Sequence, residues 1–253
     1  MKGAPGRTSV PHMAAPRNRS TDGLFYSVLA LTTLTFVVDI LYIFFKVPTE
    51  ARMGIVQKIF YFHVPIAYSM YLGATACFLG SFAYLVRPTD GRDALAKAGA
   101  QAAVAFGLMM LTTGPLWGAK AWGAFWTWDP RLTTALLSVL IYVAYVVLRS
   151  FAGDGDGERR FAAALGILGA ANLPIIHFSV QKWGGQHPMV ITGRGGGLHD
   201  PAMGVALTMG FVGFTLLAVV LIWAQARVEI VRARLRRAEE DAIDLGLDMR
   251  SEA

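Results

Sequence analysis

The sequence contains few charged residues for its length. Only 16% of its 253 residues are Asp, Glu, Lys or Arg, whereas 55% are hydrophobic. Soluble domains usually carry about a quarter charged residues. The shortage argues against a soluble protein and predicts a chain that lies mainly within a membrane.

Cysteine is almost absent, since Cys77 is the single one. No disulfide can form within the chain, and this thiol is expected to be a small core residue. The motif Cys-x-x-Cys-His is missing, so the chain is not itself a c-type cytochrome. No nucleotide-binding motif occurs either, because the glycine run at 192–197 lacks the Lys-Ser/Thr ending of a P-loop. Any energy input must therefore come from another chain.

Long apolar runs are abundant instead. About 20 apolar residues cross a bilayer as a helix, and six stretches reach or approach that length. We therefore predict an all-α integral membrane protein with six transmembrane helices. The predicted spans are Leu24–Phe45, Val64–Val86, Ala94–Leu116, Leu132–Leu148, Phe161–Val180 and Ala202–Ala224.

Several predicted spans contain polar residues, which normally face other helices or a cavity. The first contains Asp39, the third Lys97, and the fifth Asn172, Pro174 and His177. Pro174 removes a helical hydrogen bond and is expected to kink the fifth span. Asn172 and His177 then either line a polar pocket or satisfy the freed backbone groups.

Lys and Arg are unevenly distributed between the connecting segments. If the N-terminus is cytoplasmic, 16 of the 23 basic residues fall on the cytoplasmic side and 7 fall outside. Because Lys and Arg accumulate on the cytoplasmic side of membrane proteins, we expect both termini to be cytoplasmic. The net charge of +6 then reflects topology and contact with membrane lipid, and requires no nucleic-acid partner.

The chain divides into three predicted parts. Residues 1–23 form a disordered basic cytoplasmic arm, and residues 24–225 form the six-helix transmembrane domain. Residues 226–253 form a basic cytoplasmic C-terminal helix and tail that continues the sixth span. This last part is either a solvated extension at the membrane surface or a docking surface for a cytoplasmic partner.

One predicted outer loop, residues 117–133, contains four of the six tryptophans. Anchoring at the membrane interface needs one or two, so four in this stretch indicate a ligand platform. Its glycines let the backbone approach a ligand closely. Asp129 before Pro130 also favours a helix start, and Arg131 can pair with Asp129 or with a ligand carboxylate. The residues predicted to bind the ligand are Trp117, Gly118, Trp122, Gly123, Phe125, Trp126, Trp128, Asp129 and Arg131.

The predicted topology brings histidines to the same side of the membrane. His63 ends the first outer loop, His187 and His199 lie in the third, and His177 is near the outer end of the fifth span. A lone histidine near a span end is usually structural. Two histidines on separate loops around an aromatic platform instead suit a flat, metal-centred ligand. Heme has that shape, and His is its commonest axial ligand.

The stretch WGAKAWGAFWTWDPRLT resembles the tryptophan-rich "WWD" signature of the heme-handling membrane proteins of cytochrome c biogenesis. The similarity is greatest to the CcmC, or heme exporter protein C, branch of that family. The segments FHVPIAYSM and NLPIIHFSVQKW agree with it, and the resemblance covers roughly residues 24–225. One departure is Phe125-Trp126, where many relatives have adjacent tryptophans, although Phe can still stack.

The resemblance implies that heme b is held transiently and non-covalently at the periplasmic face of the bacterial inner (cytoplasmic) membrane. His63 and His187 would be the axial ligands, with His199 as the alternative to His187. His187 is favoured because it keeps the family's spacing from the NLPIIH segment. His177, His199 and Asn172 are accessory candidates.

The resemblance also implies partners: the heme chaperone CcmE, the ABC transporter subunits CcmA and CcmB, and the small membrane protein CcmD. The implied role is heme delivery to the chaperone rather than enzyme catalysis, with at most assistance in covalent attachment of heme to CcmE. Two other functions fit part of the sequence. One is a transporter or channel with Asp39, Asn172 and His177 along a path, and the other is an assembly subunit of an ABC complex.

Overall fold

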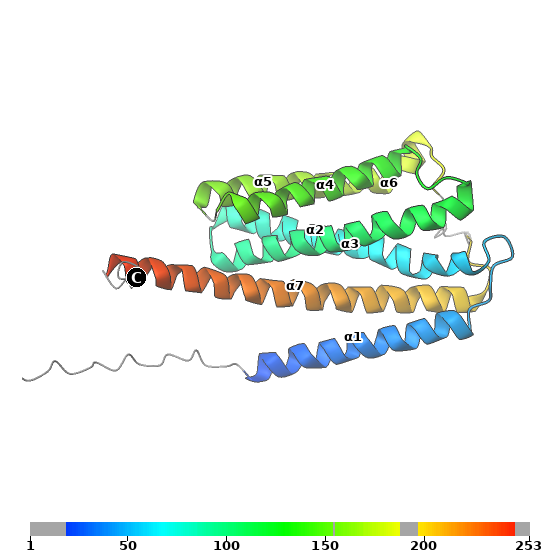
Figure 1. Ribbon diagram of the computed structural model, residues 1–253, viewed down its shortest axis with the longest axis horizontal. Helices are drawn as coiled ribbons and strands as arrows, with labels where there is room; N and C mark the ends of the chain where they lie inside the picture. The colour runs from blue at the N-terminus through cyan, green and yellow to red at the C-terminus, as the bar shows by residue number, and fades with distance from the viewer. Residues whose placement is uncertain (1–18, 154, 188–196, 246–253) are drawn as a thin grey trace, which may run out of the picture.

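The computed structural model describes residues 19–153, 155–187 and 197–245. Within these ranges the regular structure is helical, and the long helices run side by side along one axis (Figure 1). The elements are α1 (Arg19–Phe45), the 3-10 helix η1 (Ile55–Ile59), α2 (Phe60–Val86), α3 (Asp90–Trp122), α4 (Pro130–Phe151), α5 (Asp156–Ala171), α6 (Leu173–Trp183) and α7 (Pro201–Asp244).

The predicted six-span fold is confirmed. Six helical segments of the described chain are long and apolar enough to cross a membrane, and α5 and α6 together make one of them. At the right of Figure 1, α2, α4 and α7 begin and α1, α3 and α6 end. We call this the histidine end, because His63 and His187 lie there.

The closest helix pair is α2 and α3, whose backbones nearly touch. A Cβ atom added to Gly73 would lie 2.5 Å from the backbone nitrogen of Ala103, and one added to Gly99 would collide with the backbone of Cys77. Small residues allow transmembrane helices to approach this closely and gain dispersion contacts, which matter where lipid replaces water. Cys77 is fully buried in this contact, as expected for a small core residue.

Ion pairs join the helices at the opposite end of the bundle. Arg149 of α4 lies 2.7 Å from Asp93 of α3, and Lys97 of α3 lies 2.8 Å from Glu229 of α7. All four residues are buried. Lys97, a costly residue in a predicted span, is thus matched by a charge on a neighbouring helix. Because α7 continues without a break to Asp244, the predicted extension of the sixth span is helical.

The N-terminal boundary differs from the prediction. α1 begins at Arg19, so residues 19–23 of the predicted disordered arm are helical. Asp22 lies in the first turn, where the helix dipole favours a negative charge, and it pairs with Arg227 of α7 at 3.1 Å. The rest of the arm and the tail beyond residue 245 lie outside the described residues.

The fifth span is interrupted rather than merely kinked. α5 ends at Ala171, and α6 begins at Leu173 with Pro174 in its first turn. Proline lacks a backbone N–H and is well tolerated in a first turn, so the chain restarts a helix there instead of bending a continuous one.

We expect Gly99→Ala to lower the melting temperature of the detergent-solubilised protein. The added methyl group must push α2 and α3 apart, and such overpacking costs about 1–3 kcal/mol. Gly91→Ala on the same helix is the matched control, because nothing lies within 4 Å of its added Cβ. That control should melt at or above the wild-type temperature. Identical melting of the two variants would contradict a tight α2–α3 contact.

Candidate functional site

His63 lies in the first turn of α2 rather than in the preceding loop, because α2 begins at Phe60. Its Nδ1 is 2.9 Å from the Thr113 hydroxyl oxygen on α3. That hydroxyl donates its own hydrogen to the Met109 carbonyl at 2.8 Å, so it accepts a hydrogen bond from Nδ1–H. Nε2 of His63 therefore carries the lone pair, as a metal-ligating imidazole requires.

The position of the His63 ring is also set by the shape of α3. A Cβ atom at Gly114 would lie 3.0 Å from Cε1 of His63. The missing side chain at 114 thus leaves room for the imidazole, while the neighbouring Thr113 fixes its tautomer. Both contacts depend on the close packing of α2 against α3.

The tryptophan-rich stretch is not a single loop as predicted. α3 continues through Trp122 and ends at Gly123, whose φ of 76° is the left-handed conformation that commonly terminates helices. Only residues 123–129 connect α3 to α4. The predicted loop 117–133 was therefore too long, because the helix continues beyond Pro115 by about two turns. Gly123 serves as a helix cap.

Trp117 and Trp122 lie on the last turns of α3 and pack edge to face, with ring centroids 5.8 Å apart. The Trp122 ring covers Gly118, since a Cβ atom there would lie 2.9 Å from it. Gly118 therefore makes room for an indole, and its predicted close approach to a ligand stays a prediction. The Trp122 ring also faces the imidazole of His187, at 6.3 Å between centroids.

The short connection after α3 presents a second aromatic group. The rings of Trp126 and Trp128 are 5.7 Å apart. Trp128 is 76% exposed and Phe125 is 65% exposed, so both offer large apolar surfaces. The indole nitrogens of Trp117 and Trp126 are buried without a hydrogen-bond partner among the described residues. Exposed rings beside unsatisfied donors suit a surface that receives a ligand.

Asp129 starts α4, as predicted. Its Oδ1 accepts a hydrogen bond from the backbone N–H of Leu132 at 2.9 Å, and Pro130 is the first helical residue. A Cβ atom on Gly185 would lie 3.4 Å from Oδ2 of Asp129. The connection that contains the tryptophans therefore touches the segment that leads to His187.

Arg131 binds the histidine-bearing segment instead of Asp129. One guanidinium nitrogen donates to the carbonyl of His177 at 2.9 Å, and another lies 3.3 Å from Nδ1 of His187. Because a guanidinium has no acceptor atom, Nδ1 of His187 must accept this hydrogen bond. The imidazole hydrogen of His187 then lies on Nε2. The two candidate ligands are thus held in opposite tautomers, His63 with Nε2 available and His187 with Nε2 protonated.

The accessory candidates lie apart from one another. Asn172 donates to the Thr134 carbonyl and to the Ser138 hydroxyl, both at 2.8 Å, so it ties the α5–α6 break to α4. His199 is exposed directly before the helix cap of α7. His177 is exposed toward a groove between α2 and the α5–α6 span.

Asp39 is 1% exposed and faces α7, where a Cβ atom on Gly210 would lie 3.5 Å from its Oδ2. Asp39, Asn172 and His177 therefore occupy three different helix interfaces. This arrangement does not form the single polar path that the channel hypothesis needs.

Sequence reasoning missed Thr113 and Gly114. They belong to no motif, and only their position one turn before Trp117 on the same helix hints at a role. Their significance depends on facing His63 across the α2–α3 contact, which a linear pattern does not reveal.

The fold and the site together define a multi-pass membrane protein with an indole and imidazole site at one end of its helix bundle. Residues 11–241 match the family described as heme exporter protein C. The chain belongs to this heme exporter protein C (CcmC) family, as the sequence predicted.

Individual relatives agree over most of their length. The chain is 37% identical over 210 residues to heme exporter protein C of Bradyrhizobium diazoefficiens, and the aligned region covers 82% of this chain and 80% of that protein. It is 33% identical over 227 residues to heme exporter protein C of Escherichia coli K12, and the aligned region covers 88% of this chain and 90% of that protein. A Marchantia polymorpha protein named as a putative cytochrome c biosynthesis ccmC-like mitochondrial protein is 29% identical over 194 residues. The aligned region covers 76% of this chain and 82% of that protein.

We expect Thr113→Val to release the tautomer of His63. Without the hydroxyl acceptor, the ¹⁵N NMR signals of the ligand-free protein should show both His63 tautomers instead of the Nδ1–H form alone. The His63→Gln variant identifies the ¹⁵N signals of His63, because they disappear from its spectrum. Thr112→Val is the matched control, because Thr112 lies on the exposed side of α3 and its hydroxyl donates to the Leu108 carbonyl of the same helix at 2.8 Å. An unchanged His63 spectrum in Thr113→Val would refute this hydrogen-bond assignment.

Proposed function

We propose that the protein binds heme b non-covalently between His63 and His187 and delivers it to the heme chaperone CcmE during cytochrome c maturation. The observation that carries the proposal is that two imidazoles from separate segments meet the last turns of α3, His63 at Thr113 and His187 beside the Trp122 indole. The names of the relatives support it, since they are heme exporter proteins and a putative cytochrome c biosynthesis protein.

The residues present suit the chemistry of heme. Its iron accepts electron pairs from two imidazoles. Its flat apolar ring matches the exposed faces of Phe125 and Trp128. Its carboxylates match the planar guanidinium of Arg131, which can bind a carboxylate through two parallel hydrogen bonds.

Arg131 would couple binding of the carboxylates to ligation by His187. This guanidinium donates to Nδ1 of His187. A ligand carboxylate that attracts Arg131 would let the imidazole hydrogen of His187 move from Nε2 to Nδ1, and the Nε2 lone pair could then bind iron. Once the carboxylate has left and the hydrogen is back on Nε2, Nδ1 could again accept from Arg131 and His187 could no longer bind iron. Stacking and His63 would still hold the ring, so release to the chaperone would be stepwise.

We place this site at the periplasmic face of the bacterial inner membrane, with both termini cytoplasmic, on the distribution of Lys and Arg. The ABC transporter subunits CcmA and CcmB would supply the energy for which this chain has no nucleotide motif, and CcmD would accompany the complex. The protein acts as a delivery component rather than as a conventional enzyme.

The absorption spectrum of the purified protein, co-expressed with the chaperone, tests the ligand pair. We expect low-spin, six-coordinate heme in the wild type and its loss or conversion to high spin in His63→Ala and in His187→Ala. His199→Ala is the control and should keep the wild-type spectrum. A folded wild-type protein without heme, or unchanged spectra in both of the first two variants, would refute the proposal.

A second test addresses Arg131. Heme should bind the wild type at least about tenfold more tightly than its dimethyl ester, because a hydrogen bond to a charged group contributes about 1.5–3 kcal/mol. Arg131→Gln should remove this preference, whereas Lys120→Gln, at an exposed position near the end of α3, should keep it. An equal preference in the wild type and Arg131→Gln would exclude a role of Arg131 in carboxylate recognition.

A further inference from the structure

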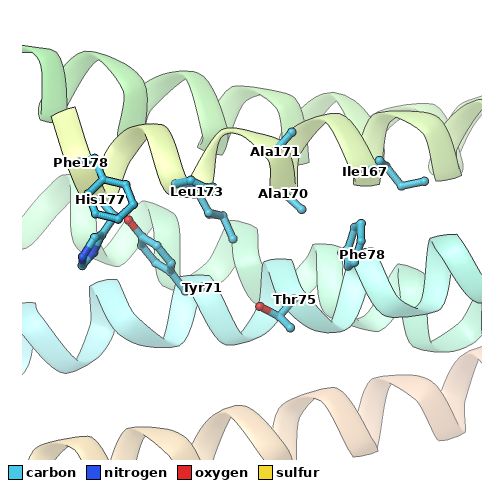
Figure 2. A pocket seen from close by; sticks show the side chains of 10 residues that line it. Tyr71, Thr75, Phe78, Ile167, Ala170, Ala171, Leu173, His177 and Phe178 are labelled. Atoms are coloured by element: carbon cyan, nitrogen blue, oxygen red, sulfur yellow. The ribbon is translucent and has the colours of Figure 1, made fainter. Parts of the chain in front are cut away.

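A groove of about 620 Å³ opens between α2 and the α5–α6 span (Figure 2). Its volume lies within the range of roughly 300–1,000 Å³ that is typical of sites for small molecules and cofactors. The lining is almost wholly apolar, and its polar side chains are Tyr71, Thr75 and His177. It is separate from the indole platform on the connection between α3 and α4.

Small residues on one wall create the groove. Ala170 and Ala171 end α5 with single methyl groups, while Thr75 and Phe78 stand opposite on α2 (Figure 2). The helix break at Asn172 follows directly. The two walls therefore leave a gap at mid-helix that larger side chains would fill.

The groove opens toward the surrounding bilayer. Both of its walls belong to segments that can cross a membrane, and Thr75, Ala171 and His177 are exposed. His177 lies six residues before Trp183, which ends α6, so it is roughly 9 Å from the histidine end of that helix. Ile167, at the other end of the groove, lies roughly 15 Å deeper.

The end of the groove nearer to Trp183 is linked to the candidate heme site. Tyr71 and His177 lie together at this end (Figure 2). The carbonyl of His177 accepts a hydrogen bond from Arg131, whose other nitrogen holds His187. This end of the groove therefore adjoins, through the backbone of His177, the arginine that the proposed function assigns to heme.

We propose that this groove is the lateral path by which heme passes from the bilayer to the His63–His187 site, with His177 and Tyr71 as temporary polar contacts. This inference rests on the proposed function and adds the route. The apolar walls suit a porphyrin ring that is dissolved in lipid. An acyl chain alone would not require an imidazole and a phenol in the membrane, where polar side chains are costly and normally functional.

A bulky side chain at the mouth of the groove tests the route. Ala171→Trp should block it, and Ala164→Trp is the matched control, because Ala164 is an exposed alanine on the same helix outside the groove. Thr75→Trp provides a second block from the opposite wall. Each protein is placed in phosphatidylcholine vesicles and mixed with vesicles preloaded with iron(III) protoporphyrin IX, and the rise of the low-spin absorption band is followed over time.

We expect Ala171→Trp and Thr75→Trp to load heme about tenfold more slowly than Ala164→Trp, a barrier increase of about 1.4 kcal/mol. Their final spectra, and their heme affinities in detergent, should equal those of the control. Loading of both groove variants at the control rate would overturn the path while leaving the proposed function intact. Loss of binding at equilibrium in both folded variants would make the groove part of the site itself and also overturn the path. Absence of low-spin heme in the wild type would refute the proposed function and this inference with it.

Discussion

The close contact between α2 and α3 is the constraint on which the rest of the site depends. Gly73 and Gly99 bring the two backbones together, and this places the first turn of α2 beside the last turns of α3. As a result His63 meets Thr113 and Gly114, which set its tautomer and its position. In lipid, where apolar burial gives no driving force, such packing between small residues is a principal source of helix association.

Arg131 is the second organising feature, and it acts through hydrogen bonds rather than packing. It joins the start of α4 to the carbonyl of His177 and the ring of His187. His63 rests on rigid helices, whereas His187 follows the end of α6 and is held by a charged side chain that a carboxylate can attract. Under the proposed function, His63 would be ready to bind iron, and His187 would become available when a carboxylate engages Arg131. This asymmetry would allow the proposed site both to hold heme and to release it.

Much of the architecture could be predicted from the sequence, because twenty-residue apolar runs identify membrane spans almost irrespective of context. The Asp129 cap and the continuous last helix followed from equally local signals. Helix ends were less predictable: α3 includes Trp117 and Trp122, and α2 includes His63, since apolar periodicity does not mark where a helix stops at an interface. The roles of Gly118, Thr113 and Arg131 depend on contacts between elements, which the order of residues along the chain does not contain.

The most direct test of the central claim is electron paramagnetic resonance of the ferric, heme-loaded protein in native membranes, with its histidines labelled with ¹⁵N. Two imidazoles on one iron predict a low-spin signal with hyperfine coupling to nitrogens from two histidines. Substitution of either His63 or His187 should remove one of these couplings. A high-spin signal, or coupling to a single histidine in the unsubstituted protein, would contradict a heme held between these two residues.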